Sequence, residues 1–298
     1  NKETNILDAE GKVKVEDVVN NYVIFSDFAK YKKNEEIIIT EGNSKGIDDK
    51  KRTITSNKFI YNKETNILDA EGKVKVEDVK KNYEIKSEKL TYFKNSDRII
   101  TTGFTEANIE NKYKIETENL LYLLKTEELS SKIKSTIRDN NNQIYLLDEF
   151  KFHADKSLLK GKNVITITNY NLPKSDKFFF LDGIFDLKNK SFTASDTEIK
   201  IHKNIFDRND NDPRIYGVSS KSQDNLTTIS KAIFTTCQNR EGCPPWSIKS
   251  QKIEHDRNKK QIQYENAILN VYDIPVFYFP KFFHPDPTVT RQSGFLRP

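Results

Sequence analysis

The chain has 298 residues, of which 31% are charged and only 35% are hydrophobic, and its formal net charge is +5. This balance argues against one thick globular core and favours a thin two-layer or solenoid-like β structure, which exposes more surface per residue. Aromatic residues do not cluster with basic ones, so the composition does not indicate a nucleic-acid-binding groove. No apolar run approaches the ~18–20 residues that a membrane-spanning helix needs.

A repeat organises the first half of the chain. Residues 1–18 recur without change at 62–79, and a finer unit of about 30 residues lies within this period. Because the chain contains no Met and begins inside a repeat, we expect it to be a piece of a longer protein. The lack of a visible signal peptide therefore excludes no compartment.

The finer unit reads Ile-x-Ser/Thr-x-x-Φ-x-Tyr, where Φ is apolar. Apolar positions two residues apart predict strands with one buried and one solvated face. The three-residue step after Ser/Thr predicts a β-bulge or a corner in the middle of each strand. A glycine recurs in the strand that follows, and successive units would stack to bury one continuous inner face. The recurring glycines are Gly11, Gly42, Gly72, Gly103 and Gly161.

The apolar positions of the repeat are the candidate lipid-binding residues, because an inner face wide enough for a guest would accept acyl chains. Burial gains ~0.8 kcal/mol per methylene, so a chain of about a dozen carbons would gain on the order of 10 kcal/mol gross. For any one of these residues, filling the core is the simpler interpretation. The candidates are Ile54, Phe59, Tyr61, Ile85, Leu90, Tyr92, Ile115, Leu120, Tyr122, Phe150, Phe152, Ile248 and Ile253.

Residues that carry chemistry are few. The four histidines, His153, His202, His255 and His284, have no metal-ligand spacing. The sequence has no Gly-rich phosphate loop and no Ser nucleophile in a recognisable elbow, and no carboxylate pair can be singled out. We therefore predict that the protein is not an enzyme and that it binds no metal or cofactor.

The last segment, from residue 243 onward, has a distinctive sequence. It contains Pro-Pro-Trp at 244–246, Ile-Lys-Ser at 248–250, His-Asp at 255–256, Asn-Ala at 266–267, Ile-Pro-Val-Phe-Tyr at 274–278, Pro280, His-Pro-Asp-Pro-Thr-Val at 284–289 and Ser-Gly-Phe-Leu at 293–296. This series closely resembles the end of the periplasmic domain in the LptD (OstA) family of LPS-assembly outer-membrane proteins, just before the membrane barrel begins.

The resemblance implies an all-β fold of the OstA-like jelly-roll or β-taco type: two antiparallel sheets with an open seam, built from the stacked repeats. A right-handed parallel β-helix ranks second, and a closed sandwich also fits the pattern. Residues 1–272 would form the repeat domain. Residues 273–298 would connect it to a barrel that is missing from this chain.

The connecting segment carries the junction residues Pro275, Phe277, Tyr278, Pro280, His284, Pro285, Asp286 and Pro287. Proline cannot donate a ladder hydrogen bond, so we expect this strand to lie at a sheet edge or to be bulged. Its dense aromatic residues suit a membrane interface or a seal between domains. The simpler alternative is that these aromatic residues form a hydrophobic plug at the end of the repeat array.

Cys237 and Cys243 precede this segment. Without a nearby His partner they make a poor zinc site. The resemblance implies disulfide formation in the periplasm, an oxidising compartment. Two pairings stay open, a local Cys237–Cys243 bridge and bridges from these cysteines to the barrel.

The function that the resemblance implies is lipopolysaccharide transport at the periplasmic face of the outer membrane of a Gram-negative bacterium. The chain would accept the lipid from a periplasmic bridge of the same fold through edge-strand pairing. It would then pass the lipid to its own barrel, which an outer-membrane lipoprotein plugs. Two alternatives remain, a soluble bridge or chaperone of the same fold and a secreted β-helix that acts on polysaccharide.

Overall fold

The computed structural model describes residues 5–170, 175–201, 212–238, 244–285 and 289, and every long element in these ranges is a β-strand. The only helical segments described are two single 3₁₀ turns, η1 (Lys94–Ser96) and η2 (Ala154–Lys156). Within the same ranges, no helix has the length and apolarity to cross a membrane. The predicted all-β class is confirmed.

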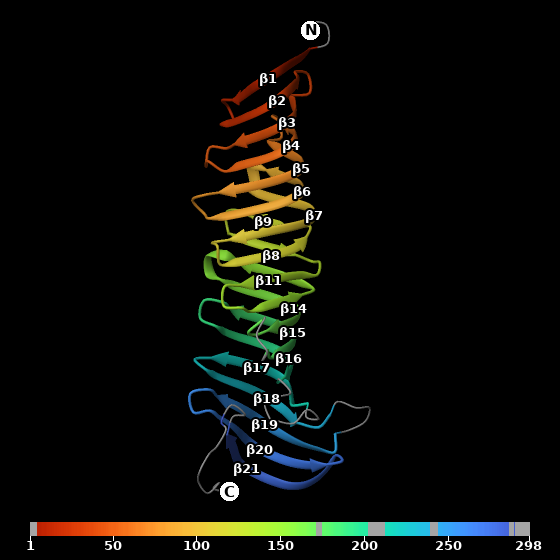
Figure 1. Ribbon diagram of the computed structural model, residues 1–298, viewed down its shortest axis with the longest axis vertical. Helices are drawn as coiled ribbons and strands as arrows, with labels where there is room; N and C mark the ends of the chain where they lie inside the picture. The colour runs from red at the N-terminus through yellow and green to blue at the C-terminus, as the bar shows by residue number, and fades with distance from the viewer. Residues whose placement is uncertain (1–4, 171–174, 202–211, 239–243, 286–288, 290–298) are drawn as a thin grey trace. The chain divides into compact units, whose positions relative to one another are not determined.

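The chain divides into two compact units, and unit 1 comprises Asn1–Asn140 with Lys151–Asp155. Figure 1 shows its first seven strands stacked in chain order. The strands are β1 (Ile6–Asp17), β2 (Tyr22–Lys32), β3 (Ile37–Ile47), β4 (Thr53–Asn62), β5 (Ile67–Asp78), β6 (Tyr83–Phe93), β7 (Arg98–Ile109), β8 (Tyr113–Glu118), β9 (Leu121–Leu123), β10 (Glu128–Ser131) and β11 (Ser135–Asp139).

Unit 2 comprises Asn141–Phe150 and Lys156–Pro298. Its strands are β12 (Ile144–Leu147), β14 (Leu158–Ile167), β15 (Lys177–Asp186), β16 (Ser191–Lys200), β17 (Arg214–Gln223), β18 (Leu226–Thr235), β19 (Trp246–Asp256), β20 (Gln261–Val271) and β21 (Ile274–Pro285). The short strand β13 (Glu149–His153) has residues in both units.

Neighbouring strands in the chain pair with each other and run antiparallel, as β4 with β5 and β19 with β20 do. All 21 described strands belong to one hydrogen-bonded set, in which eight strands form a closed antiparallel ring and 13 are bonded outside it. The parallel β-helix is therefore wrong for the described residues, because its strands would pair in parallel.

The break in the alternation lies where the sequence predicts it. The β4–β5 pairing shifts register between Thr55 and Lys58, at the step after Ser56. The glycine strands also shift, between Glu71 and Val74 on β5 and between Glu41 and Ser44 on β3. Gly42 and Gly72 lie at these shifts with φ of +74° and +77°, in the left-handed region that residues with a Cβ avoid. Each shift is a β-bulge that bends its strand in the middle.

The bends bring distant parts of the strands together. Tyr22 begins β2 and Tyr61 lies near the end of β4, and their rings stack with centroids 5.3 Å apart. Eight residues of straight strand span about 26 Å, so flat strands would hold these rings far apart. The equivalent residues one period later, Tyr83 and Tyr122, also meet, edge to face with ring centroids 5.1 Å apart. Each strand therefore curls around the apolar interior.

A glycine substitution tests this backbone constraint. Gly103 has φ of +81°, and an added Cβ would meet no atom within 4 Å. Gly103→Ala should therefore lose roughly 1–2 kcal/mol of unfolding free energy from backbone strain alone. Gly103→Asn should lose less, because Asn tolerates the left-handed region. Urea unfolding measures both variants, and equal losses would contradict a backbone cause.

Candidate functional site

The predicted lipid-binding residues lie in the interior. Twelve of the thirteen are at most 4% exposed, and Ile248 on β19 is half-buried. The twelve buried residues are Ile54, Phe59, Tyr61, Ile85, Leu90, Tyr92, Ile115, Leu120, Tyr122, Phe150, Phe152 and Ile253. We call the buried residues of unit 1 in this set the inner apolar face.

The opposite face of the same strands is solvated. On β6, Ile85, Leu90 and Tyr92 are buried, whereas Lys86 and Glu88 are exposed. The described side chains of the inner apolar face pack closely. The space between Tyr22, Ile54, Val76 and their neighbours leaves no room for a water molecule.

Two rows of turns meet in unit 1. The first row contains residues 18–21, 48–52 and 79–82, and the second contains 63–66, 94–97 and 124–127. The Asn20 side chain donates to the Lys63 carbonyl at 3.4 Å, and Lys81 Nζ donates to the Leu124 carbonyl at 2.8 Å. We call the line along which the rows meet the seam. The open seam expected from the sequence is closed at these contacts.

A buried ionic cluster closes the middle of the seam. Arg52 lies in the first row, where its Nε donates to Asp48 at 2.7 Å. Its Nη2 reaches across to Asp97 of the second row at 3.1 Å and also contacts the Tyr92 hydroxyl. Lys50 adds a second bond to Asp97. The Arg52 cluster, which is Asp48, Lys50, Arg52, Tyr92 and Asp97, thus links both rows.

The cluster is fixed electrostatically. Burial alone would raise the pKa of Asp97, but hydrogen bonds from Lys50 and Arg52 outweigh it and hold that pKa below its usual value. The pKa of Arg52 is raised, because the nearby Tyr92 and Asp48 offset its desolvation. Burial raises the pKa of the Tyr92 phenol. The pKa shifts of Asp97 and Arg52 favour the carboxylate and the guanidinium, so their contact across the seam is an ion pair.

Sequence reasoning missed the polar contacts that close the seam, although the repeat holds a signal for them. Asp17, Asp48 and Asp78 recur at one repeat position, and each is only 6% exposed. Acidic residues are seldom buried without a partner. A recurring Asp at the end of a strand therefore indicates a polar contact made once per period.

Removing the central cation should weaken unit 1. Arg52→Leu leaves Asp48 and Asp97 buried without their main partner, so we expect a loss of about 3–5 kcal/mol in unfolding free energy. The control is Lys89→Leu, because the Lys89–Glu71 pair is exposed on the outer face; it should change stability by less than about 0.5 kcal/mol. Urea unfolding at pH 7 compares them. Equal stability of the two variants would show that the cluster does not hold the seam.

Unit 2 contains a cavity of about 150 Å³. Aromatic side chains line part of it, and two basic side chains lie among the polar lining residues. The lining residues are Gln143, Tyr145, Thr166, Thr168, Phe178, Phe185, Asp186, Leu187, Lys190, Ser191, Phe192, Ser222, Asn225 and Arg257.

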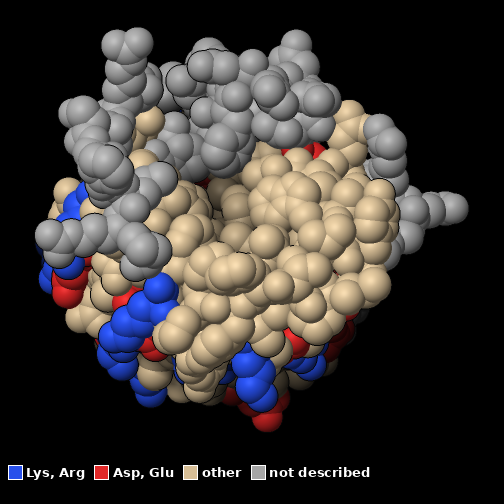
Figure 2. All heavy atoms as spheres, turned by 90° about the horizontal axis from the view of Figure 1, so that it is seen from below, with Lys and Arg blue, Asp and Glu red and all other residues tan. Residues whose placement is uncertain are grey.

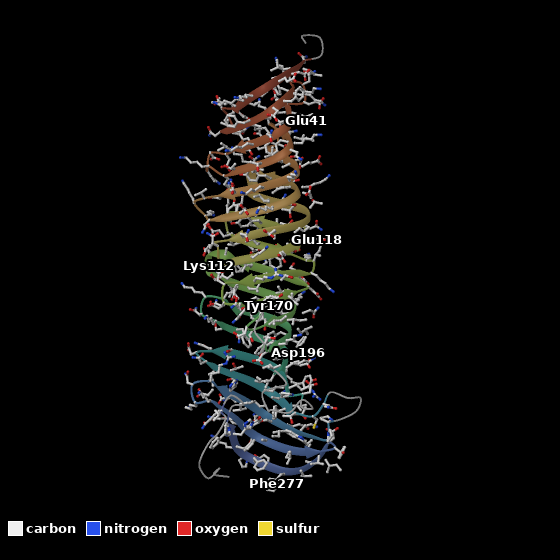
Figure 3. The ribbon with its side chains drawn as sticks, viewed as in Figure 1. Glu41, Lys112, Glu118, Tyr170, Asp196 and Phe277 are labelled. Carbon is white, nitrogen blue, oxygen red and sulfur yellow. The ribbon has the colours of Figure 1, made fainter. Side chains whose placement is uncertain are left out.

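The predicted junction strand is β21. It pairs with β20, and the pairing is bulged between Leu269 and Asn270, beside Pro275, which agrees with the expected effect of that proline. Phe277 and Tyr278 are 60% and 54% exposed, and Figure 3 labels Phe277 on this strand. Figure 2 looks at this end of the structure, where uncharged side chains cover the centre and charged ones lie at its edge.

The remaining junction residues are only partly described. His284, near the end of β21, contacts the Tyr264 hydroxyl through Nε2 at 3.0 Å and the carbonyl of Pro285 through Nδ1 at 2.7 Å. Asp286 and Pro287 lie outside the described residues.

Cys237 has a free thiol, and no disulfide occurs among the described residues. Cys243 lies outside them. Within the described ranges, no three His, Cys, Asp or Glu side chains come together as a metal-ligand set.

Comparison with known proteins finds distant, partial similarity to LPS-assembly proteins. The LPS-assembly protein LptD of Shewanella denitrificans is 27% identical over 157 residues, which are 49% of this chain and 20% of that protein. LptD of Hahella chejuensis is 32% identical over 114 residues, or 38% and 13% of the two chains. LptD of Coxiella burnetii is 32% identical over 74 residues, or 25% and 8%.

The matched region thus spans about a fifth or less of the length of these relatives. No protein-family model matches the chain.

Proposed function

We propose that this chain carries lipopolysaccharide during its assembly into the outer membrane, with the acyl chains held against the inner apolar face. The observation that carries the proposal is the regular burial of one apolar face in a protein similar to LptD. The role is transport, not catalysis. The compartment would be the periplasm of a Gram-negative bacterium.

The fold of this proposal is a folded antiparallel sheet of the β-taco type, whose two halves face each other across the acyl chains. The curled strands and antiparallel pairings support it. An acyl chain of about a dozen carbons would gain on the order of 10 kcal/mol gross from burial. This gain must exceed the cost of separating side chains that now contact each other.

Loading requires the seam of unit 1 to open. The inner side chains leave no room for a water molecule beside Ile54, and the Arg52 cluster joins the two turn rows. Because the cluster is polar, water can solvate its charges when the rows part. The same groups that close the empty seam would therefore permit opening when a lipid occupies the interior.

The partners in this proposal follow the similarity to LptD. A periplasmic bridge of the same fold would add a strand beside β1 through main-chain hydrogen bonds. Residues 1–272 would form the carrier domain, and residues 273–298 would lead into the chain's own barrel with its lipoprotein plug. The exposed aromatic residues of β21 support a contact with a further domain or the membrane interface.

Site-specific photo-crosslinking tests the proposal. A benzophenone side chain at Leu90 or Leu120, which are buried on the inner apolar face, should capture lipopolysaccharide in cells. The same group at Lys86 or Glu88, exposed on the outer face of β6, should capture little. A tenfold difference in captured lipid is the expected scale for inner against outer positions.

Thr91, half-buried between Leu90 and Tyr92, is a close control, because it differs from them only in the face it occupies. Capture from the outer positions equal to that from Leu90 would contradict a lipid path along the inner face. Variants that lose the far-ultraviolet circular dichroism signal of β structure are unfolded and are excluded.

A further inference from the structure

The cavity of unit 2 has an aromatic side. Tyr145 begins this wall at the start of β12, and its ring meets that of Phe185 with centroids 5.6 Å apart. Phe192 lies 5.9 Å from Phe185, and Phe178 also lines the space. These rings offer methylene groups a surface removed from water.

The polar side of the cavity carries two basic groups. Lys190 lies in the turn between β15 and β16, and Arg257 follows β19. Both side chains are exposed. Neither forms an ion pair within the part of the chain that the structure describes, whereas the seam cations Lys50, Lys63 and Lys81 of unit 1 all do.

The carboxylate in the lining does not neutralise both cations. Asp186 accepts hydrogen bonds from the Asn189 backbone at 2.9 Å and the Asn189 side chain at 2.8 Å. These bonds lower its pKa and hold it in the turn. The lining therefore combines two cations with one locally bonded anion, and it retains an excess of positive charge.

The volume restricts the ligand. Sites that enclose a whole small molecule usually measure ~300–1,000 Å³, and this cavity measures about 150 Å³. It can hold only part of a larger molecule, at a point where a charged group adjoins an apolar one. Thr166 and Ser191 also line the cavity, and their hydroxyl groups are of a type that donates to anions.

We propose that this cavity binds the phosphate-bearing end of an acylated lipid, with its phosphate at Lys190 and Arg257 and its first methylenes against Phe178 and Phe185. The inference rests on the proposed function and adds, in unit 2, a separate binding site for the anionic headgroup and the methylenes next to it. Charge-assisted hydrogen bonds from Arg and Lys are the usual means of holding phosphate.

The test is binding of diphosphoryl lipid A, in micelles of a neutral maltoside detergent, to the whole 298-residue chain. The double variant K190Q/R257Q should bind about tenfold more weakly, because both phosphate contacts are lost. The matched control is K188Q/K260Q, which removes two exposed cations from the same turns without touching the cavity lining. It should change the dissociation constant less than about twofold.

The outcomes separate the two proposals. If K190Q/R257Q binds lipid A as the wild type does while Leu90 still captures lipid, the headgroup site is wrong and the carrier function stands. If the wild type neither binds lipid A nor crosslinks at Leu90, the carrier function itself fails. Displacement by millimolar inorganic phosphate alone, with no effect of acyl length, would overturn a lipid site in favour of a free-phosphate site.

Discussion

The bulge in the middle of each strand is the constraint on which the rest of unit 1 depends. Without it, Tyr22 and Tyr61 would lie at opposite ends of a flat sheet, and the inner apolar face would be exposed to water on one side. With it, the strands curl until the turns at their two ends face each other. The acidic residues at those turns then lie beside cations from the opposite row, as Asp97 lies beside Arg52. Strand curvature and seam chemistry are therefore one feature of the repeat.

The two units use their polar residues differently. In unit 1 the seam cations are matched by carboxylates, carbonyls and phenols, and the interior beside Ile54 has no room for a water molecule. In unit 2 a cavity remains, and Lys190 and Arg257 line it without an ion-pair partner among the described residues. A matched, buried cluster favours closure, because breaking it exposes charge at a cost. An unmatched pair of cations favours an anionic ligand. In this proposal, unit 1 therefore provides closure and unit 2 provides headgroup recognition.

The repeat predicts the strands, their buried faces and the central bulge, because these depend on residues close together in the chain. It does not predict the closed seam, since Arg52 meets Asp97 across 45 residues and only the curvature decides how near the rows come. The cavity of unit 2 is not predictable from the sequence either, because Tyr145 on β12 and Arg257 after β19 lie far apart in the chain. The bulge of β21 was predictable from Pro275, because proline cannot donate to a ladder.

The most direct test is the distance between the two turn rows when lipid is added. Spin labels are attached at Lys80→Cys and Lys125→Cys in a chain that also carries Cys237→Ser and Cys243→Ser. Both labelled positions are exposed, and they lie in turns that the Lys81–Glu127 ion pair joins at 2.7 Å. Pulsed electron spin resonance measures the distance between the two labels. When acylated lipid A binds, this distance should increase by several ångströms, which is about half of a ~10 Å sheet spacing and about the thickness of one layer of acyl chains. The deacylated sugar should leave it unchanged. An unchanged distance with lipid A captured at Leu90 would contradict loading by opening of the seam.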